Sequence, residues 1–148
     1  MPADEFLTPW AGAACRHISD DSPIGVLDFR FAGTGRRNRW NLSGQPTLYL
    51  ASDHGVLIGE FARHLDRDRA LPGQPTAEAR RVYDLRVRLD AALDLRDPRL
   101  CAELSLRDAP ACFLDRALCQ AVSGYVRRTT PAQALLVPSI AFLDDPHR

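Results

Sequence analysis

The 148-residue sequence contains no lysine, and its basic residues are 19 arginines. The absence of lysine excludes a Walker A loop, whose lysine contacts the β- and γ-phosphates of a nucleotide. It also excludes the Schiff-base lysine of pyridoxal-phosphate enzymes and aldolases, and the strand lysine of protein kinases. Any anion site must therefore use arginine, whose planar guanidinium binds phosphates and carboxylates through two parallel hydrogen bonds.

The sequence also lacks an excess of either charge, because 19 acidic residues balance the 19 arginines. A protein dedicated to nucleic acid normally carries a clear basic excess. The densest basic run is Arg36, Arg37 and Arg39, which is either a loop that contacts phosphates or a solvated charged loop. The neutral balance argues against nucleic-acid binding by this chain.

Signals for secretion, membrane insertion and metal binding are missing as well. Residues 1–10 lack the apolar stretch of a signal peptide, and no apolar run approaches the roughly 18 residues of a membrane span. The cysteines form no C-x-x-C pair and no zinc-finger spacing with the histidines. We therefore expect a cytoplasmic protein with no membrane contact, no bound metal and reduced thiols. The cysteines are Cys15, Cys101, Cys112 and Cys119.

Length and composition fit one globular domain, with 45% hydrophobic and 26% charged residues and a core expected over about residues 13–143. The predicted strands cover residues 13–18, 47–51, 81–89 and 133–137, with a weaker strand or an irregular segment over 26–31. The predicted helices cover residues 53–65, 98–106 and 110–127, the last with Cys112 and Cys119 as small core residues. The pattern indicates an α+β fold with a mixed β-sheet and flanking helices.

Two charged residues stand beside predicted core positions. Glu60 lies at the edge of the apolar stripe formed by positions 57, 58, 61 and 65 of its helix, so its carboxylate can be half-buried. Alternatively, it is a boundary residue that pairs with Arg63 or His64. Arg16 interrupts an apolar strand, from which its side chain can point outward to water. Taken singly, neither residue indicates a function.

Several short motifs follow one another along the chain. Arg16 lies in C-R-H-I, Arg39 opens R-W-N-L-S-G, and Tyr49 lies in L-Y-L-A. Glu60 follows on the next predicted helix, and Ser139 ends L-V-P-S. In this order and spacing the motifs resemble the RES domain family, which is named for its arginine, glutamate and serine. The resemblance covers nearly the whole chain, from about residue 16 to residue 139.

This resemblance implies a fold similar to that of ADP-ribosyltransferase toxins, and a toxin that arrests growth within a type II toxin–antitoxin pair. Family members consume NAD by hydrolysis or phosphorolysis, and a few transfer ADP-ribose to a protein. The implied substrate is NAD, with inorganic phosphate as the co-substrate of phosphorolysis and no permanently bound cofactor or metal. The implied partner is an Xre-type antitoxin that binds DNA, in a complex that combines toxin and antitoxin dimers.

The resemblance also assigns roles to five residues. Arg16, Glu60 and Ser139 match the three motif positions, while Arg39 and Tyr49 match further pocket positions. The two arginines would hold the diphosphate of NAD, and Tyr49 would stack on the cationic nicotinamide ring. Glu60 would stabilise the oxocarbenium-like transition state and orient the attacking water or phosphate. Ser139 would hydrogen-bond the nicotinamide amide or the adjoining ribose.

The end of the chain departs from the family pattern. Family members normally continue past the serine with a further apolar strand, whereas nine residues follow Ser139 here. Either the chain is naturally short or this final strand is missing from the sequence. Two alternatives to an NAD-degrading toxin remain open, and the short end of the chain supports the second of them. One is a protein ADP-ribosyltransferase that uses the same pocket, and the other is a catalytically inactive interaction module.

Overall fold

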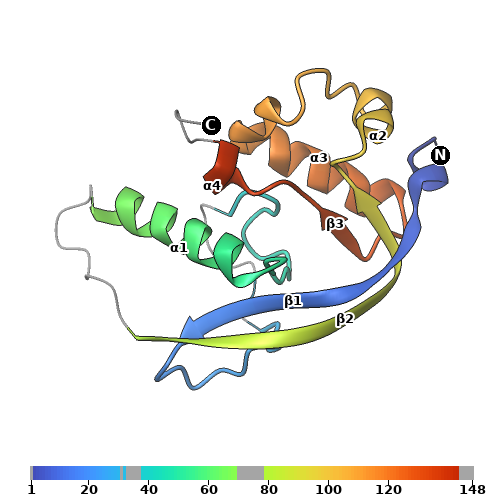
Figure 1. Cartoon of the computed structure of the whole chain (residues 1–148). Coiled ribbons are helices and arrows are strands. Elements are labelled where there is room, and N and C mark those ends of the chain that lie inside the picture. Colours follow the sequence, from blue (N-terminus) through green and yellow to red (C-terminus); the bar gives the residue numbers. More distant parts are fainter. Residues whose placement is uncertain (1, 31, 33–37, 70–78, 144–148) are drawn as a thin grey trace.

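The computed structural model describes residues 2–30, 32, 38–69 and 79–143. It confirms the predicted α+β class with a mixed sheet and flanking helices (Figure 1). No helix of the described ranges is long and apolar enough to cross a membrane. The elements in chain order are η1 (Pro2–Phe6), β1 (Thr8–Ser19), α1 (His54–Arg69), β2 (Arg80–Asp94), α2 (Pro98–Glu103), η2 (Ala111–Leu114), α3 (Arg116–Thr129), β3 (Ala134–Leu136) and α4 (Ile140–Leu143).

A long antiparallel ribbon of β1 and β2 forms most of the sheet, and β3 adds to the end of β2 in parallel. Pairing runs from Thr8 opposite Ala92 to Ser19 opposite Arg80, with a register shift between Thr8 and Trp10. In β2, half-buried residues at 83, 85, 87 and 89 alternate with exposed ones, as the sequence pattern predicts. Both strands exceed their predicted lengths because backbone pairing continues beyond the apolar positions.

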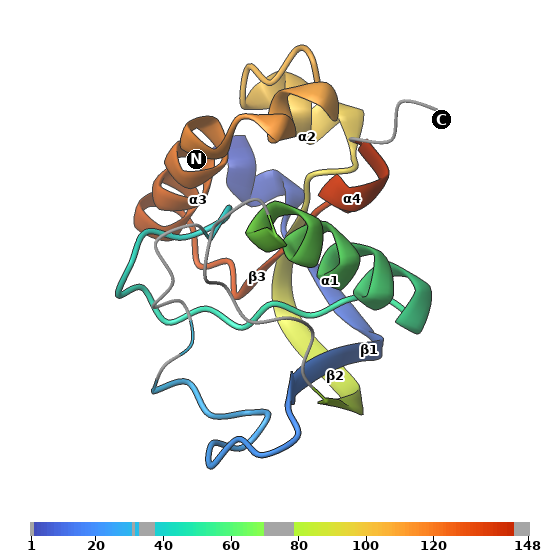
Figure 2. The same cartoon turned by 90° about the vertical axis from the view of Figure 1, so that its left-hand side faces the viewer.

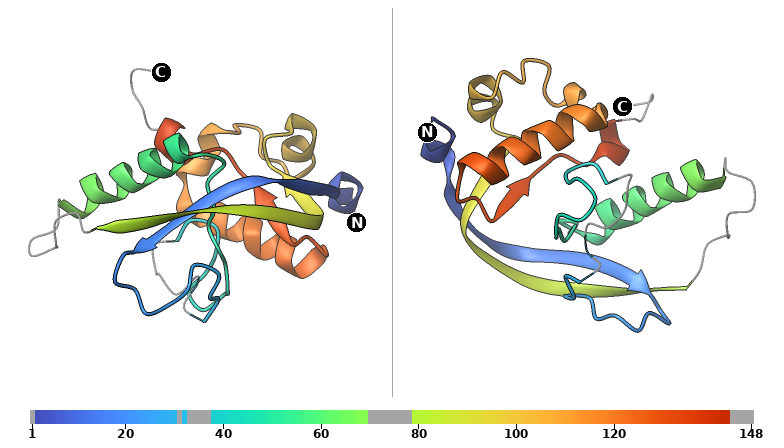
Figure 3. Two further views of the ribbon diagram at one scale, coloured as in Figure 1. Left: turned by 60° about the horizontal axis from the view of Figure 1, so that its bottom comes forward. Right: turned by 180° about the vertical axis from the view of Figure 1, so that it is seen from behind.

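The helices lie on one side of this curved ribbon. Figure 1 and the right-hand view of Figure 3 show α1 above one end of it and α3 with β3 above the other. The main core forms at the α3 end, where Leu93, Leu100, Phe113 and Cys119 have no exposed surface. A second, smaller cluster joins the ribbon to α1 through Cys15, Ala51 and Leu57. Figure 2 shows the same arrangement from the side.

The structure corrects three sequence-based predictions and decides between two alternatives for residues 26–31. Residues 47–51 contain β-formers but form no strand, because their only bridge joins Ala51 to Cys15. The described part of 26–31 is the irregular alternative and not a strand. The predicted helix over 110–127 is two pieces, because Asp115 has an extended backbone that ends η2 and caps α3. The predicted apolar stripe of α1 is wrong at Ile58, which is 66% exposed.

The Asp115 cap leads to a prediction about stability. Its carboxylate accepts a hydrogen bond from the backbone N–H of Leu118 at 3.2 Å, which satisfies one of the unpaired donors of the first turn of α3. We expect Asp115→Ala to lower the free energy of unfolding by about 1 kcal/mol. Urea denaturation measures the change. As a control, Asp108→Ala removes an exposed carboxylate that has no bonded partner among the described residues, so equal losses in both variants would contradict the capping role.

Cys119 gives a second prediction, which concerns alkaline pH. It is confirmed as a core residue, and burial raises the pKa of its thiol from 9.0 to about 11. Because the folded pKa lies above the unfolded one, the thiol's stabilising contribution is complete below pH 9 and is lost as pH rises toward 11. We expect the wild type to lose about 2 kcal/mol more unfolding free energy than Cys119→Ala between pH 8 and 11. Unfolding free energies of the wild type and Cys119→Ala that fall in parallel between pH 8 and 11 would contradict this prediction.

Candidate active site

The structure joins Glu60 and Ser139 although 79 positions separate them. The Ser139 hydroxyl donates to Glu60 Oε1 at 2.5 Å, and the backbone N–H of Ala141 donates to the same oxygen at 3.2 Å. Both side chains are half-buried. The other carboxylate oxygen accepts no hydrogen bond from the described residues, so it is available to a ligand. A carboxylate fixed at one oxygen and open at the other can act toward a bound substrate.

Helix packing brings this pair together. Ser139 lies between β3 and the short α4, and α4 packs against α1. A side-chain carbon at Gly59 would lie 3.5 Å from the ring of Phe142 and 3.7 Å from the Ala141 side chain. The first turn of α4 therefore rests on the face of α1 that also carries Glu60. The predicted alternative partner His64 has a side chain outside the described set, and the hydrogen bonds of Glu60 go to Ser139 and Ala141.

Arg16 lies on the face of β1 that points away from α1. Its half-buried guanidinium donates to the carbonyl of Val26 at 2.6 Å, and burial lowers the pKa of this group. The side chain lines a hollow of about 240 Å³ at the end of β1, together with His17 and Arg80. Strand alternation places Arg16 on the opposite face from Cys15, which packs against Leu57 of α1. No hydrogen bond or ion pair within the described residues joins Arg16 to Glu60.

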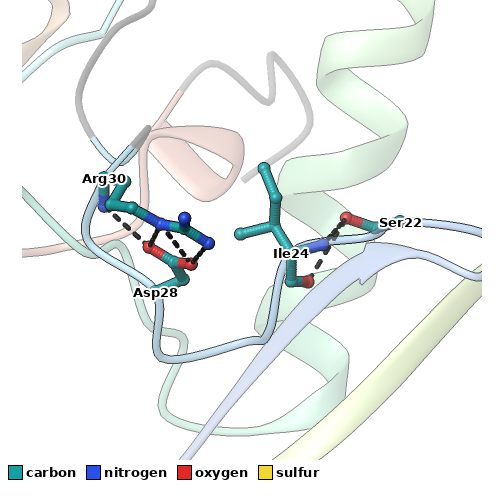
Figure 4. A network of polar contacts seen from close by, with 4 residues as sticks. All are labelled: Ser22, Ile24, Asp28 and Arg30. Carbon is teal, nitrogen blue, oxygen red and sulfur yellow. Dashed lines mark hydrogen bonds and ion pairs between the residues drawn. The ribbon is translucent and has the colours of Figure 1, made fainter.

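The segment that faces Arg16 is held by its own polar contacts (Figure 4). The Arg30 guanidinium binds both carboxylate oxygens of Asp28 at 2.6–3.1 Å and holds the pKa of that carboxyl below its usual range. The Ser22 hydroxyl accepts from the backbone N–H of Ile24 at 3.2 Å. These contacts lie on either side of Val26 and favour the turn that presents its carbonyl to Arg16.

The hydroxyl of Tyr49 is held by two hydrogen bonds, whereas part of its ring is exposed. The hydroxyl donates to Asn41 Oδ1 at 2.6 Å and accepts from the backbone N–H of Trp40 at 2.9 Å. Its environment is desolvated enough that burial raises the pKa of the phenol, yet the residue is 40% exposed. The hydroxyl therefore orients a ring whose remaining surface can stack on a planar ligand.

Arg39 holds the loop of the R-W-N motif against η2. Its Nη1 donates to the carbonyls of Phe113 at 2.8 Å and Leu114 at 2.9 Å. Gln120 of α3 holds the same loop by donating to the carbonyls of Asn38 and Asn41. The structure thus gives Arg39 a structural contact that the sequence did not predict, and only its remaining N–H groups are available to a phosphate.

The five predicted site residues therefore lie in separate groups, of which only Glu60 and Ser139 are directly bonded to each other. Sequence reasoning missed Asn41, Gln120 and the Ala141 N–H. The motif asparagine was a usable signal, because Asn41 is only 1% exposed and a buried amide needs partners. Among the residues described, no three His, Cys, Asp or Glu side chains lie together as a metal site.

Comparison with known proteins adds two findings. A family model described as the RES domain matches residues 15–148. The chain is also similar to a chain in the crystal structure of the M. tuberculosis MbcT–MbcA toxin–antitoxin complex, with a TM-score of 0.66 and 22% sequence identity. That alignment covers 91% of this chain and 72% of the other, and at this identity it shows a shared fold. No curated protein matches the sequence.

Proposed function

The chain belongs to the RES domain family, and from this we propose that it is an NAD-degrading toxin that cleaves the bond between nicotinamide and ribose. The observation that carries the proposal is the half-buried Glu60 carboxylate, held at one oxygen by Ser139 and Ala141. The similarity to a chain of a toxin–antitoxin complex supports the biological role.

The chemistry needs one well-placed carboxylate. Nicotinamide leaves as a neutral molecule and requires no general acid, while the ribose develops oxocarbenium-like positive charge. The open oxygen of Glu60 stabilises that charge and hydrogen-bonds the ribose 2′-hydroxyl or the attacking nucleophile. The bonds from Ser139 and Ala141 hold the carboxylate in place before the substrate arrives, so little reorganisation is needed during the reaction.

Substrate binding is assigned to residues other than the Glu60–Ser139 pair, with one additional role for Ser139. Arg16 has a half-buried guanidinium with a single backbone partner, and its other N–H groups can bind the diphosphate of NAD. Arg39 contributes its remaining donors to the same task. The exposed ring of Tyr49 stacks on the cationic nicotinamide, and Asn41 keeps that ring in position. Ser139 additionally hydrogen-bonds the nicotinamide amide or the adjoining ribose.

Product analysis tests the reaction type. Purified protein is incubated with NAD labelled in the adenosine part, with and without inorganic phosphate. Hydrolysis yields ADP-ribose, and phosphorolysis yields its 1″-phosphate only when phosphate is present. Label attached covalently to protein would instead identify the chain as an ADP-ribosyltransferase, in place of hydrolysis and phosphorolysis. NAD that stays intact under all conditions would contradict the proposal as a whole.

The partner of this toxin, under the same proposal, is an Xre-type antitoxin that also carries the DNA-binding function, in a complex built from dimers of each protein. Induced expression of the toxin alone should arrest growth and deplete cellular NAD, and co-expression of the antitoxin should prevent both. Glu60→Gln is the matched control and should be harmless at equal protein level. Normal growth and NAD despite accumulation of folded wild-type protein would contradict the role as a toxin.

A further inference from the structure

Two arginines of β2 serve none of the roles described above. Arg86 and Arg88 are both exposed, and neither forms a hydrogen bond or an ion pair with any residue that the structure describes. Most other arginines of the described ranges behave differently. Arg30, Arg81, Arg96 and Arg99, for example, each pair with a carboxylate. Arg86 and Arg88 are therefore two neighbouring exposed guanidiniums that no described carboxylate binds, although Asp84 and Asp90 lie on the same face at either end of the pair.

Strand register fixes the side of the ribbon on which this pair lies. Arg86 stands opposite Ala13, and the next pair on the same face is Cys15 opposite Asp84. Cys15 packs against α1, and Asp84 Oδ1 lies 2.6 Å from His54 Nε2 at the start of α1. Because side chains two apart in a strand share a face, the arginine pair lies on the α1 side of the ribbon.

The part of β1 that pairs with Arg86 and Arg88 carries small, exposed side chains. Arg86 and Arg88 face Ala13 and Ala11 of β1, and both alanines are exposed. Methyl side chains leave room for another backbone to approach the strand closely. The two guanidiniums extend from positions two residues apart, which is roughly 7 Å along a strand. An extended segment with carboxylates at every second position has the same repeat.

The form of this surface indicates the class of ligand. Small molecules bind mostly in concave sites, whereas this pair lies on an exposed sheet face and lines neither the hollow beside Arg16 nor the apolar hollow beside Cys101. Nucleic acid would require a longer basic track, but Asp84 and Asp90 lie at either end of the pair and the chain has no net charge. A short acidic segment of a protein fits both the charge and its limited extent.

We propose that Arg86 and Arg88, with the alanine surface opposite them, form a docking site for a short acidic segment of a protein partner. The docking site itself is independent of the enzymatic activity. Only the identification of that partner as the antitoxin rests on the proposed function. The guanidiniums then bind the partner's carboxylates bidentately, and these carboxylates supply the counter-charge that no described residue places in contact with the pair.

A fluorescent peptide that alternates glutamate with alanine tests this site, by anisotropy at low ionic strength. The wild type should bind it, and the double variant Arg86→Ala/Arg88→Ala should bind at least about tenfold more weakly. Arg86→Lys/Arg88→Lys, which keeps both charges but loses the bidentate geometry, should bind with an affinity between those of the wild type and the double alanine variant. Arg107→Ala is the matched control, because Arg107 is also exposed and has no bonded partner in the part of the chain that the structure describes. Peptide binding by this variant should stay within about twofold of the wild type.

Three outcomes would overturn the site. They are unchanged binding by the double alanine variant, equal binding of a peptide with glutamine in place of glutamate, and tighter binding of a single-stranded oligonucleotide through the same two arginines. Nicotinamide release is measured in parallel and should not change in the double variant. An inactive wild type that still binds the peptide would refute only the proposed enzyme, whereas an active wild type that ignores the peptide would refute only the docking site.

Discussion

Glu60→Gln is expected to lower the rate constant for nicotinamide release from NAD by about 100- to 1,000-fold. The amide has the size of the carboxylate and can still accept the Ser139 hydroxyl and the Ala141 N–H through its oxygen. It loses the negative charge that opposes the oxocarbenium ion, so the loss should appear in kcat and not in KM. Steady-state kinetics with NAD separates the two constants, and circular dichroism confirms that the variant is folded.

Ser139→Ala provides the graded comparison. It removes one of the two donors to Glu60 Oε1 but leaves the Ala141 N–H and the charge in place. Its kcat should therefore fall by a smaller factor, about tenfold, than that of Glu60→Gln. A Glu60→Gln variant with the turnover of the wild type would show that this carboxylate is not the catalytic group. A larger loss in Ser139→Ala than in Glu60→Gln would shift that role to the hydroxyl.

Phe113→Ala should produce the largest loss of stability, about 3–5 kcal/mol in the free energy of unfolding. Phe113 is completely buried and stands edge-on to the ring of Trp40, with centroids 5.3 Å apart. Truncation leaves a cavity in the main core and removes the ring contact that joins the R-W-N loop to η2. Chemical denaturation measures the change.

Leu114→Ala is the control for this prediction. The neighbouring residue is apolar and 42% exposed, so its truncation should cost less than about 1 kcal/mol. The contrast tests whether the core lies where the structure places it. A loss below about 1 kcal/mol for Phe113→Ala, or equal losses for both variants, would contradict a packed core around this ring.

The elements that the sequence predicted well are those whose signal is local. The alternation of Leu85, Val87 and Leu89 with charged residues predicted β2, and the apolar spacing after Asp53 predicted α1. Residues 47–51 failed because strand formation also needs a partner, and only Ala51 has one. The break in the helix over 110–127 was readable in principle, since Asp115 is a favourable N-cap residue followed by a helical segment.

The candidate site shows a similar division. Family motifs selected Glu60 and Ser139, and the structure bonds them to each other across 79 positions. No local pattern could predict the bond between Arg39 and the Phe113 carbonyl, because it depends on how η2 packs against a distant loop. The site roles of Arg16, Arg39 and Tyr49 remain predictions that binding measurements on single variants can test. Each of these three residues has a defined hydrogen bond in the structure, which a single substitution can remove.

NAD cleavage by this protein is tested most directly by the release of nicotinamide from NAD by the purified wild-type protein, free of any partner. Chromatography follows nicotinamide and the remaining NAD over time, and Glu60→Gln serves as the blank. We expect NAD to be consumed in many-fold molar excess over the protein and nicotinamide to appear in equal amount, with no comparable loss of NAD in the blank. Folded wild-type protein that releases no nicotinamide, with or without phosphate, would contradict this expectation.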